Sequence, residues 1–312
     1  MLEMSQQKFS DPLTHEASIL LLGSCFSDEI GHQFVQNGFQ AAINPGGTIF
    51  HPLALAHLLE WALNENKQLR RIQREDIWLS WDLSGSVYAL TEQELQLKLK
   101  QLRKKLFQCI SESTHLMVTF GTSWAYKLLE DQQIVANCHK FPADKFSKEN
   151  TSVEEMCQVW KALIGQIKSL NPEIKLIFTV SPVRHSKDGL HENNLSKARL
   201  FLLVEQLTAI SNCFYFPAYE LVNDQLRDYS FFKEDGIHPN AKATAYVWDF
   251  FKRNHLEPAT QLVLKDWDAL QLAMKHRIMY PESKSAAIYR KHLHNQKEEF
   301  FTKHPQFRTI QL

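Results

Sequence analysis

Short apolar segments alternate with longer segments of helical periodicity over the first 255 residues, and this alternation constrains the fold more than any other feature. Four apolar segments bounded by turn residues are expected to form strands, within 18–22, 114–121, 174–185 and 213–222. In the third of these segments a loop is expected to follow the strand. Segments with apolar residues every three or four positions separate them. Strands that alternate with helices form βαβ units, so the sequence predicts an α/β fold whose parallel sheet is covered on both faces.

The pattern changes after about residue 255. Residues 260–279 and 286–305 have helical periodicity, and the sequence YPES separates them. We therefore expect one α/β domain, residues 1–254, followed by an α-helical C-terminal extension, residues 255–312, that packs on the domain or projects from it.

Charge and hydropathy argue against several classes of protein. Lys+Arg and Asp+Glu both number 35, and no basic cluster is interleaved with aromatic residues, so no nucleic-acid partner is expected. The N-terminus lacks the apolar core of a signal peptide, and no segment has the apolar length of a transmembrane helix. The five cysteines are scattered without a CxxC pair. We expect a cytoplasmic protein with free thiols and with no metal or cofactor.

Ser24 and Cys25 directly follow the first predicted strand, at a turn into a helix that Ser27 is expected to cap. The N-terminus of a helix offers unpaired amides and a positive dipole end, which can lower the pKa of a thiol and hold an oxyanion. This pattern indicates a candidate nucleophile. A structural interpretation is also open, in which the serine caps the helix and the cysteine is a small buried side chain.

Asp235 and His238, in the sequence DGIHPN, form a second candidate group. An aspartate and a histidine three residues apart in a glycine-containing turn can face the same cleft. The carboxylate would then fix the tautomer of the imidazole and support it as a general base. Taken alone, the sequence is equally compatible with a structural interpretation, in which the turn opens a helix and the histidine lies at the surface.

The motifs GSCF, GTSWAY and DGIHPN, in this order, resemble those of the GSCFA family, which is related to the SGNH/GDSL hydrolases. The sequences NPGGTIFHP, NCHKFP, SPVRH and NNLSKARL extend the resemblance over roughly residues 15–255. The resemblance implies a flavodoxin-like, three-layer α/β/α fold of the SGNH hydrolase type. It also implies hydrolysis or transfer of an acyl group at a Ser-His-Asp-type site without metal.

The resemblance also implies residue roles. GSCF placed on the GDSL motif puts Cys25 at the nucleophile and Ser24 at the neighbouring position, while His238 and Asp235 fall on the histidine and the acid. His238 would then activate the thiol, and a thioester would pass its acyl group to water or another acceptor. The alternative is that Ser24 is the nucleophile in a shifted turn.

Candidates for binding the oxyanion or the substrate come from the same resemblance. Gly47 takes the place of the oxyanion-hole glycine, and the GxND block reads GTSW, so Ser123 replaces the asparagine. His139 either approaches the site or is a satisfied turn residue. The complete set is Gly47, Gly121, Thr122, Ser123, Asn137 and His139.

Other polar residues are less specific. Arg184 can contact a substrate carboxylate or phosphate, or form a structural ion pair. His185 is equally compatible with a substrate contact and a surface loop, and His255 is expected at a solvated helix surface. The sequence therefore favours an acyl-ester hydrolase or acyltransferase acting on an acylated sugar, a lipid or another small ester. The alternatives are a binding module that keeps the fold and a protein whose C-terminal helices recruit a partner.

Overall fold

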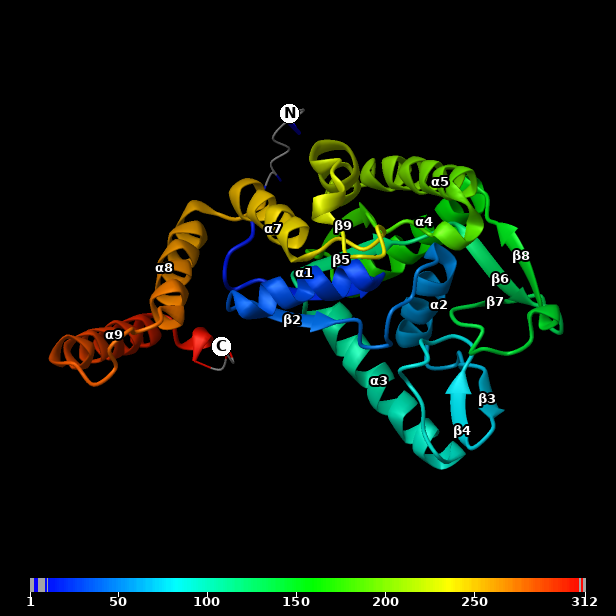
Figure 1. Ribbon diagram of the computed structural model, residues 1–312. Coiled ribbons are helices and arrows are strands. Elements are labelled where there is room, and N and C mark those ends of the chain that lie inside the picture. Colours follow the sequence, from blue (N-terminus) through cyan, green and yellow to red (C-terminus); the bar gives the residue numbers. More distant parts are fainter. Residues whose placement is uncertain (1–2, 5–8, 10, 309, 311–312) are drawn as a thin grey trace.

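The computed structural model describes residues 3–4, 9, 11–308 and 310, and in this part of the chain a five-stranded parallel sheet forms the centre of the molecule (Figure 1). The strand order is β10-β9-β5-β1-β2. Counted along the chain, this is the order 2-1-3-4-5 of flavodoxin-like doubly wound sheets. The strands are β1 (Ser18–Gly23), β2 (Gln40–Ile43), β5 (His115–Phe120), β9 (Lys175–Val180) and β10 (Cys213–Tyr215).

Helices cover both faces of this sheet because its strands carry apolar side chains on both sides. In β1, Leu20 and Leu22 contact the core beneath α2, α3, α4 and α5, whereas Ile19 and Leu21 contact the core beneath α1 and α7. The predicted three-layer α/β/α fold is thereby confirmed. The helices are α1 (Cys25–Gln36), α2 (Pro52–Leu63), α3 (Glu92–Glu112), α4 (Val153–Leu170), α5 (Leu190–Thr208), α6 (Ala218–Glu220), which continues into a π-helical turn (Leu221–Leu226), and α7 (Ala241–His255).

Edge strand β2 and most strands of two small antiparallel sheets are not predicted from the sequence, in which residues 77–90 are expected only to be irregular or β. The strands concerned are short, and several carry charged residues, so they have little hydrophobic periodicity. One small sheet pairs β3 (Arg71–Arg74) with β4 (Ile77–Ser80). The other has the order β7-β6-β8, formed by Ile134–Val135, Trp124–Leu128 and Phe146–Asn150. This second sheet follows β5 directly and therefore lies next to the carboxyl edge of the central sheet.

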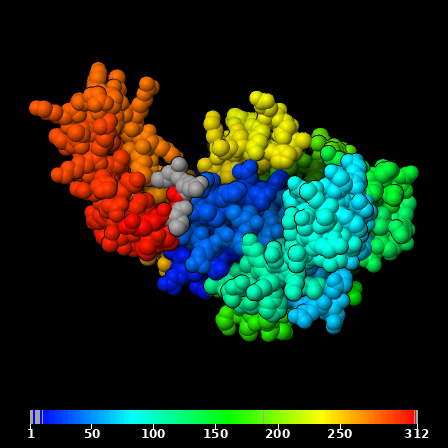
Figure 2. All heavy atoms as spheres, turned by 90° about the horizontal axis from the view of Figure 1, so that it is seen from below, coloured from blue at the N-terminus to red at the C-terminus, as the bar shows by residue number. Residues whose placement is uncertain are grey.

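Helices α8 (Pro258–Lys275) and α9 (Lys284–Lys303) form the C-terminal extension, drawn in orange and red at one end of the molecule (Figures 1 and 2). Trp267 is fully buried, and its ring stacks on Phe300 at 5.5 Å between centroids. Its Nε1 donates a hydrogen bond to Gln36 O at the end of α1 (3.0 Å). An aromatic cluster thus attaches the extension to α1. Within the described ranges, no helix has the length and apolar character needed to cross a bilayer.

His255, at the end of α7, is fully buried, so its expected solvated position is wrong. Its ring stacks on Phe9 at 3.9 Å between centroids and contacts Phe216 and Phe251. Neither ring nitrogen has a hydrogen-bond partner in the described part of the chain. Burial lowers the pKa of His255 to about 4, so the ring is neutral at pH 7. Phe251 lies one helical turn earlier on the same face, which is the apolar face of α7.

Candidate active site

The turn after β1 places Ser24 and Cys25 at the carboxyl edge of the sheet. Gly23 has φ +133°, and a Cβ on it would lie 2.2 Å from Thr119 O, so a larger residue cannot occupy this turn. Ser24 is the N-cap of α1, and its Oγ accepts a hydrogen bond from Phe26 N (3.3 Å). Helix α1 therefore begins at Cys25, whose side chain projects from its first position.

Ser27 is not the helix cap, contrary to the expectation from the sequence. Its Oγ donates a hydrogen bond to Leu22 O (3.1 Å) and lies 2.8 Å from Thr119 Oγ1. These bonds fasten the first turn of α1 to β1 and β5. The helix starts earlier than expected because Ser24 already has the extended backbone and the side-chain oxygen that a cap requires.

A cavity of about 670 Å³ is formed by residues that follow β1, β5 and β9. Between β1 and β5 the order of the strands reverses, and doubly wound sheets bind their ligands at this point. The loop before α7 and the segment after β7 complete the cavity wall. Its lining residues include Ser24, Cys25, Phe50, His51, Thr122, Trp124, Tyr126, Asn137, Cys138, Ser181, Arg184, His185, Lys187, Ile237 and His238.

His238 lines this cavity, and Asp235 holds its ring. Nδ1 of His238 lies 2.7 Å from Oδ2 of Asp235, and Oδ1 of Asp235 accepts hydrogen bonds from the amides of Ile237 and His238 (both 2.9 Å). The His238 amide, followed by the Ile237 amide and the imidazole, lowers the pKa of Asp235 to about 2. The carboxylate is therefore ionised at neutral pH and accepts from Nδ1–H. This leaves Nε2 as the basic nitrogen of the neutral ring.

The loop that carries His238 is tied to both neighbouring helices. Asn240 caps α7 with its Oδ1, and its Nδ2 donates to Phe232 O (3.1 Å) within the loop. Lys233 Nζ lies 3.2 Å from Glu29 Oε1 on α1. The histidine loop is therefore connected to the helix that begins with the candidate nucleophile.

Cys25 is the more accessible of the two candidate nucleophiles. Ser24 is only 1% exposed, whereas the Cys25 side chain is half-buried. Burial raises the pKa of the Cys25 thiol, and the Asp28 carboxylate raises it further. Among the described residues, no hydrogen bond joins His238 Nε2 to either side chain. A thiol with a raised pKa is mainly protonated at neutral pH, so it requires a base to become a nucleophile.

Thr122 and Asn137 are the candidates for oxyanion or substrate binding that line the cavity. Asn137 Oδ1 accepts a hydrogen bond from His139 N (2.7 Å), which leaves the Nδ2 amide as the group that can donate to a ligand. Thr122 Oγ1 lies 3.0 Å from Ser196 Oγ. Asn137 therefore offers the stronger candidate donor.

Ser123 and His139 are not among the residues that line the cavity. Ser123 is fully buried, and its Oγ donates to Asn150 Oδ1 at 2.5 Å. His139 is 5% exposed, and its Nε2 lies 2.7 Å from Ser80 O. His139 is therefore a satisfied turn residue. The hydroxyl of Ser123, which was expected to replace the oxyanion-hole asparagine, is already hydrogen-bonded to Asn150.

The two candidate glycines are also not among the residues that line the cavity. Gly47 has φ +76°, and a Cβ on it would lie 2.3 Å from Ser84 Cβ. Gly121 donates its amide to Phe50 O (2.8 Å). Gly47 thus permits a tight loop, and the amide of Gly121 is already engaged.

His51 lines the cavity, although the sequence gives no reason to select it. Its Nδ1 accepts a hydrogen bond from Leu53 N (3.2 Å), and this cap opens α2. Its Nε2 lies 3.2 Å from Ser123 O. Burial lowers the pKa of His51 to about 4, so the ring is neutral at pH 7, and its hydrogen bonds give it a structural role. The only signal in the sequence is its position before Pro52, the first residue of a helix.

Arg184 also lines the cavity, and the structural ion pair left open by the sequence is not observed among the described residues. Its Nε donates to Asn223 Oδ1 (3.2 Å), and Asn223 Nδ2 in turn donates to Pro182 O (3.0 Å). The guanidinium is thus oriented by a neutral amide. Contact with a substrate remains the other interpretation.

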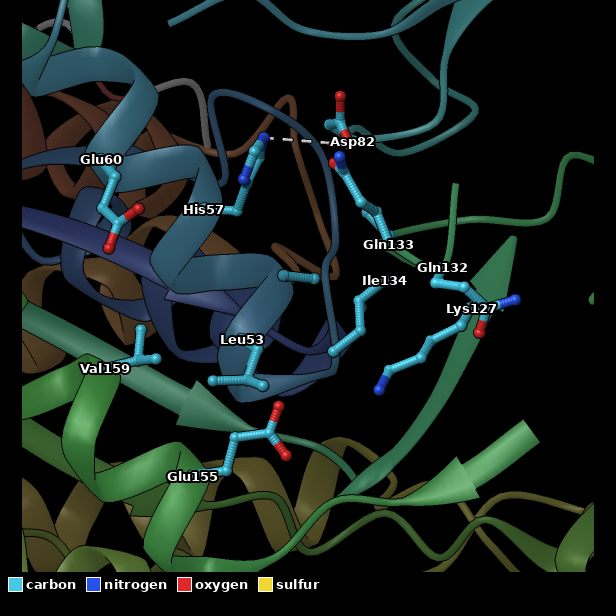
Figure 3. Close-up of a pocket in the computed structure, with 12 residues that line it drawn as sticks. Leu53, His57, Glu60, Asp82, Lys127, Gln132, Gln133, Ile134, Glu155 and Val159 are labelled. Carbon is cyan, nitrogen blue, oxygen red and sulfur yellow. Dashed lines mark ion pairs between the residues drawn. The ribbon is translucent and has the colours of Figure 1, made fainter. Parts of the chain in front are cut away.

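A second cavity, of about 320 Å³, lies beside α2 (Figure 3). His57 Nε2 lies 3.9 Å from Asp82 Oδ1 in this cavity, but Arg70 already binds Asp82 through Nε (2.9 Å). Glu60 pairs with Lys67. No serine, threonine or cysteine lines this cavity among the described residues. The cavity at the sheet edge, which contains a thiol and a histidine, is therefore the candidate active site.

The strand order, and the cavity at the point where it reverses, define the chain as a doubly wound α/β protein of the flavodoxin type. The sequence model of the GSCFA family matches residues 18–251. The chain belongs to the GSCFA family, as the dispersed motifs indicated. No match is found among curated proteins.

The solved structures to which the chain is similar include a protein described as a platelet activating factor from Streptococcus pneumonia. It is 11% identical, with a TM-score of 0.40 over 76% of this chain and 83% of that chain. A carbohydrate esterase family 3 protein from Talaromyces cellulolyticus is 8% identical, with a TM-score of 0.37 over 80% and 99% of the two chains. A family 3 carbohydrate esterase from Clostridium thermocellum is 11% identical, with a TM-score of 0.34 over 81% and 98%.

Proposed function

We propose that this protein is an acyl-ester hydrolase or acyltransferase that works through a thioester on Cys25. One observation carries the proposal: a single cavity at the switch point of the sheet contains the Cys25 thiol and the His238 ring, and Asp235 is bound to that ring. A nucleophile, a base and a carboxylate that act together support acyl transfer on several unrelated folds. The reaction requires no metal or cofactor, and we expect it to take place in the cytoplasm.

In the proposed reaction, His238 Nε2 takes the proton from Cys25 Sγ while the sulfur attacks the acyl carbonyl. The C–O bond of the ester then breaks, and the imidazolium returns the proton to the departing alcohol. Water or another acceptor, deprotonated by His238, attacks the thioester and releases the thiol. Asp235 keeps Nδ1 protonated and stabilises the imidazolium throughout.

The oxyanion of each tetrahedral intermediate needs donors near Cys25. The main-chain amide of Cys25 lies at the positive end of α1 and favours negative charge on the sulfur. We propose that this amide and Asn137 Nδ2 hold the oxyanion, since the hydroxyl of Ser123 is engaged by Asn150.

The substrate is a small acyl ester, or the acylated part of a glycan or lipid. Phe50, Trp124 and Tyr126 line the cavity, and their apolar faces suit a sugar ring or an acyl chain. Arg184 and Asn137 supply polar groups that would orient it.

A binding module that keeps the fold is the second candidate. The hydrogen bond from Ser123 Oγ to Asn150 favours this candidate. Ser123 was expected to supply an oxyanion donor, but its hydroxyl is not available to a ligand in the cavity. Such a module would bind an acylated ligand without turning it over.

Steady-state hydrolysis of 4-nitrophenyl acetate tests the proposal. Cys25→Ala should lower kcat/KM by about 10³-fold or more, because the nucleophile is lost. Cys109→Ala, a thiol of α3, is the matched control and should retain the wild-type rate. Equal rates for wild type and Cys25→Ala would reject the thioester, and an absence of hydrolysis by the wild type would favour the binding module.

A further inference from the structure

The connection between α8 and α9 carries most of the strongly exposed apolar side chains of the described chain. We call residues 272–291 the tip: it includes the last turn of α8, the connection and the first turns of α9, and it points away from the α/β domain (Figures 1 and 2). Four large apolar or aromatic residues of the tip are each at least 70% exposed: Leu272, Met279, Tyr280 and Ile288. Only one other such residue in the described part of the chain, Tyr229, is as exposed. Exposed apolar side chains concentrated in this way mark an interaction surface.

The tip is also strongly basic. It contains one acidic residue, Glu282, whereas Lys+Arg and Asp+Glu are equal in number, 35 each, over the whole chain. The ion pairs of the extension use Asp268, Glu298 and Glu299, which lie outside the tip. No cation of the tip forms an ion pair within the described ranges, so these charges are available to a partner. All of them are exposed: Lys275, Arg277, Lys284, Arg290 and Lys291.

Hydrogen bonds within the tip hold it in shape. Ser283 caps α9, and its Oγ accepts a hydrogen bond from Ala286 N (3.1 Å). Tyr289 donates its hydroxyl to Ala273 O (2.8 Å), which joins the start of α9 to the end of α8. The tip therefore presents its apolar and basic side chains on a backbone that needs no rearrangement to meet a partner.

An anionic lipid bilayer matches both properties of the tip. Lysine and arginine side chains are attracted to the phosphate groups of its lipids, and apolar side chains gain free energy by entering the boundary between headgroups and acyl chains. A nucleic acid would bind the cations but would offer no apolar phase to Leu272, Met279 and Ile288. We propose that the tip docks the protein on a bilayer that contains anionic lipids. Met279 and Tyr280 enter the headgroup region, and the cations of α9 contact lipid phosphates.

Helix α3 offers a matched control surface. It also carries exposed lysines, among them Lys104 and Lys105. However, it packs along the domain through buried residues such as Leu95 and Leu102, so its lysines lie on the flank of the domain and not on a projecting end. Leu97, on the exposed side of α3, is the control for an apolar side chain.

Cosedimentation of the full chain with lipid vesicles tests the proposal. The wild type should bind vesicles of equal parts phosphatidylglycerol and phosphatidylcholine, and added salt should weaken this binding. Binding to phosphatidylcholine alone should be much weaker. Met279→Gln should lower the partition coefficient by about tenfold, because an apolar side chain is lost from the lipid. Arg290→Gln combined with Lys291→Gln should lower it by about 25-fold, since each cation near an anionic surface contributes about fivefold.

The control variants on α3 are Leu97→Gln and the combination of Lys104→Gln with Lys105→Gln, and both should bind as the wild type does. All these side chains are exposed, so the substitutions should leave the fold intact. Wild-type protein that does not bind the anionic vesicles, or binds both kinds of vesicle equally, would overturn the proposal. Binding that is lost with the cations but unchanged in Met279→Gln would overturn it in favour of a nucleic acid or an acidic protein surface. Equal effects of the α3 and tip variants would overturn it too.

Discussion

Nδ1 of His238 lies 2.7 Å from Oδ2 of Asp235, and the ring of this histidine lines the same cavity as Cys25. The pair is exposed at the edge of the cavity, with 42% and 46% of the two side chains accessible. Its geometry therefore depends on the loop more than on burial. The loop is held in place by hydrogen bonds from the amides of the DGIH turn to Asp235 and from the side chain of Asn240 to Phe232 O.

We expect the Asp235 carboxylate to support catalysis by fixing the tautomer of His238. Asp235→Asn removes the acceptor for Nδ1–H, so the ring can present a proton instead of a lone pair to the thiol. We expect kcat/KM for an activated ester to fall by about 10²-fold or more. Asp228→Asn, in the preceding turn, is the matched control and should stay near wild type. Equal effects of the two substitutions would show that the loop, and not the carboxylate contact, is important.

Replacing Ser24 should separate capping from catalysis. Ser24→Ala removes the oxygen that accepts from Phe26 N, and the loss of an N-cap costs about 1 kcal/mol of unfolding free energy. Chemical denaturation measures this loss, and an ester assay should show that most activity is retained. Loss of activity as complete as in Cys25→Ala, without loss of stability, would instead identify Ser24 as the nucleophile.

The sequence predicts the parts of the site that are encoded locally. The strand-to-helix turn at Ser24–Cys25 and the Asp235–His238 turn each lie within a few residues, so their patterns can be recognised without the fold. The contacts of Ser123 and Lys197 join segments far apart in the chain, to Asn150 and to the ends of β5 and β9. Such contacts depend on the packing of α5 and the small sheets, whose strands have weak periodicity.

The buried histidines should make the protein sensitive to mild acid. Burial lowers the pKa of His51, His115 and His255 to about 4, from a value near 6.5 in the unfolded chain. The unfolded chain therefore binds more protons between pH 6.5 and 4, and the unfolding free energy falls as the pH is lowered through this window. Urea denaturation at pH 7 and pH 5 measures the difference.

His255→Phe offers a matched control for this effect. The ring lies among phenylalanines and has no hydrogen-bond partner in the described part of the chain, so phenylalanine should fit and remove one of the three titrations. We expect a smaller loss of stability between pH 7 and pH 5 than in the wild type. An unchanged pH dependence would show that His255 does not titrate in this way.

Trp267 should attach the C-terminal extension to the α/β domain. Trp267→Ala removes a fully buried ring that stacks on Phe300 and bonds Gln36 O, and large-to-small changes of this kind cost about 3–5 kcal/mol. Leu272→Ala on the same helix, at 74% exposure, should cost less than about 0.5 kcal/mol. Thermal unfolding of the full chain compares the two. Similar melting curves for both variants would contradict an attachment through Trp267.

The central claim is that Cys25 carries the acyl group and His238 activates it. Intact-mass analysis after mixing the protein with an activated acyl ester, followed by peptide mapping, tests both statements in one measurement. We expect a single acyl adduct on Cys25 that forms much more slowly in His238→Ala. An adduct on Ser24, label only on surface lysines, or equal labelling of Cys25 in His238→Ala would contradict the account.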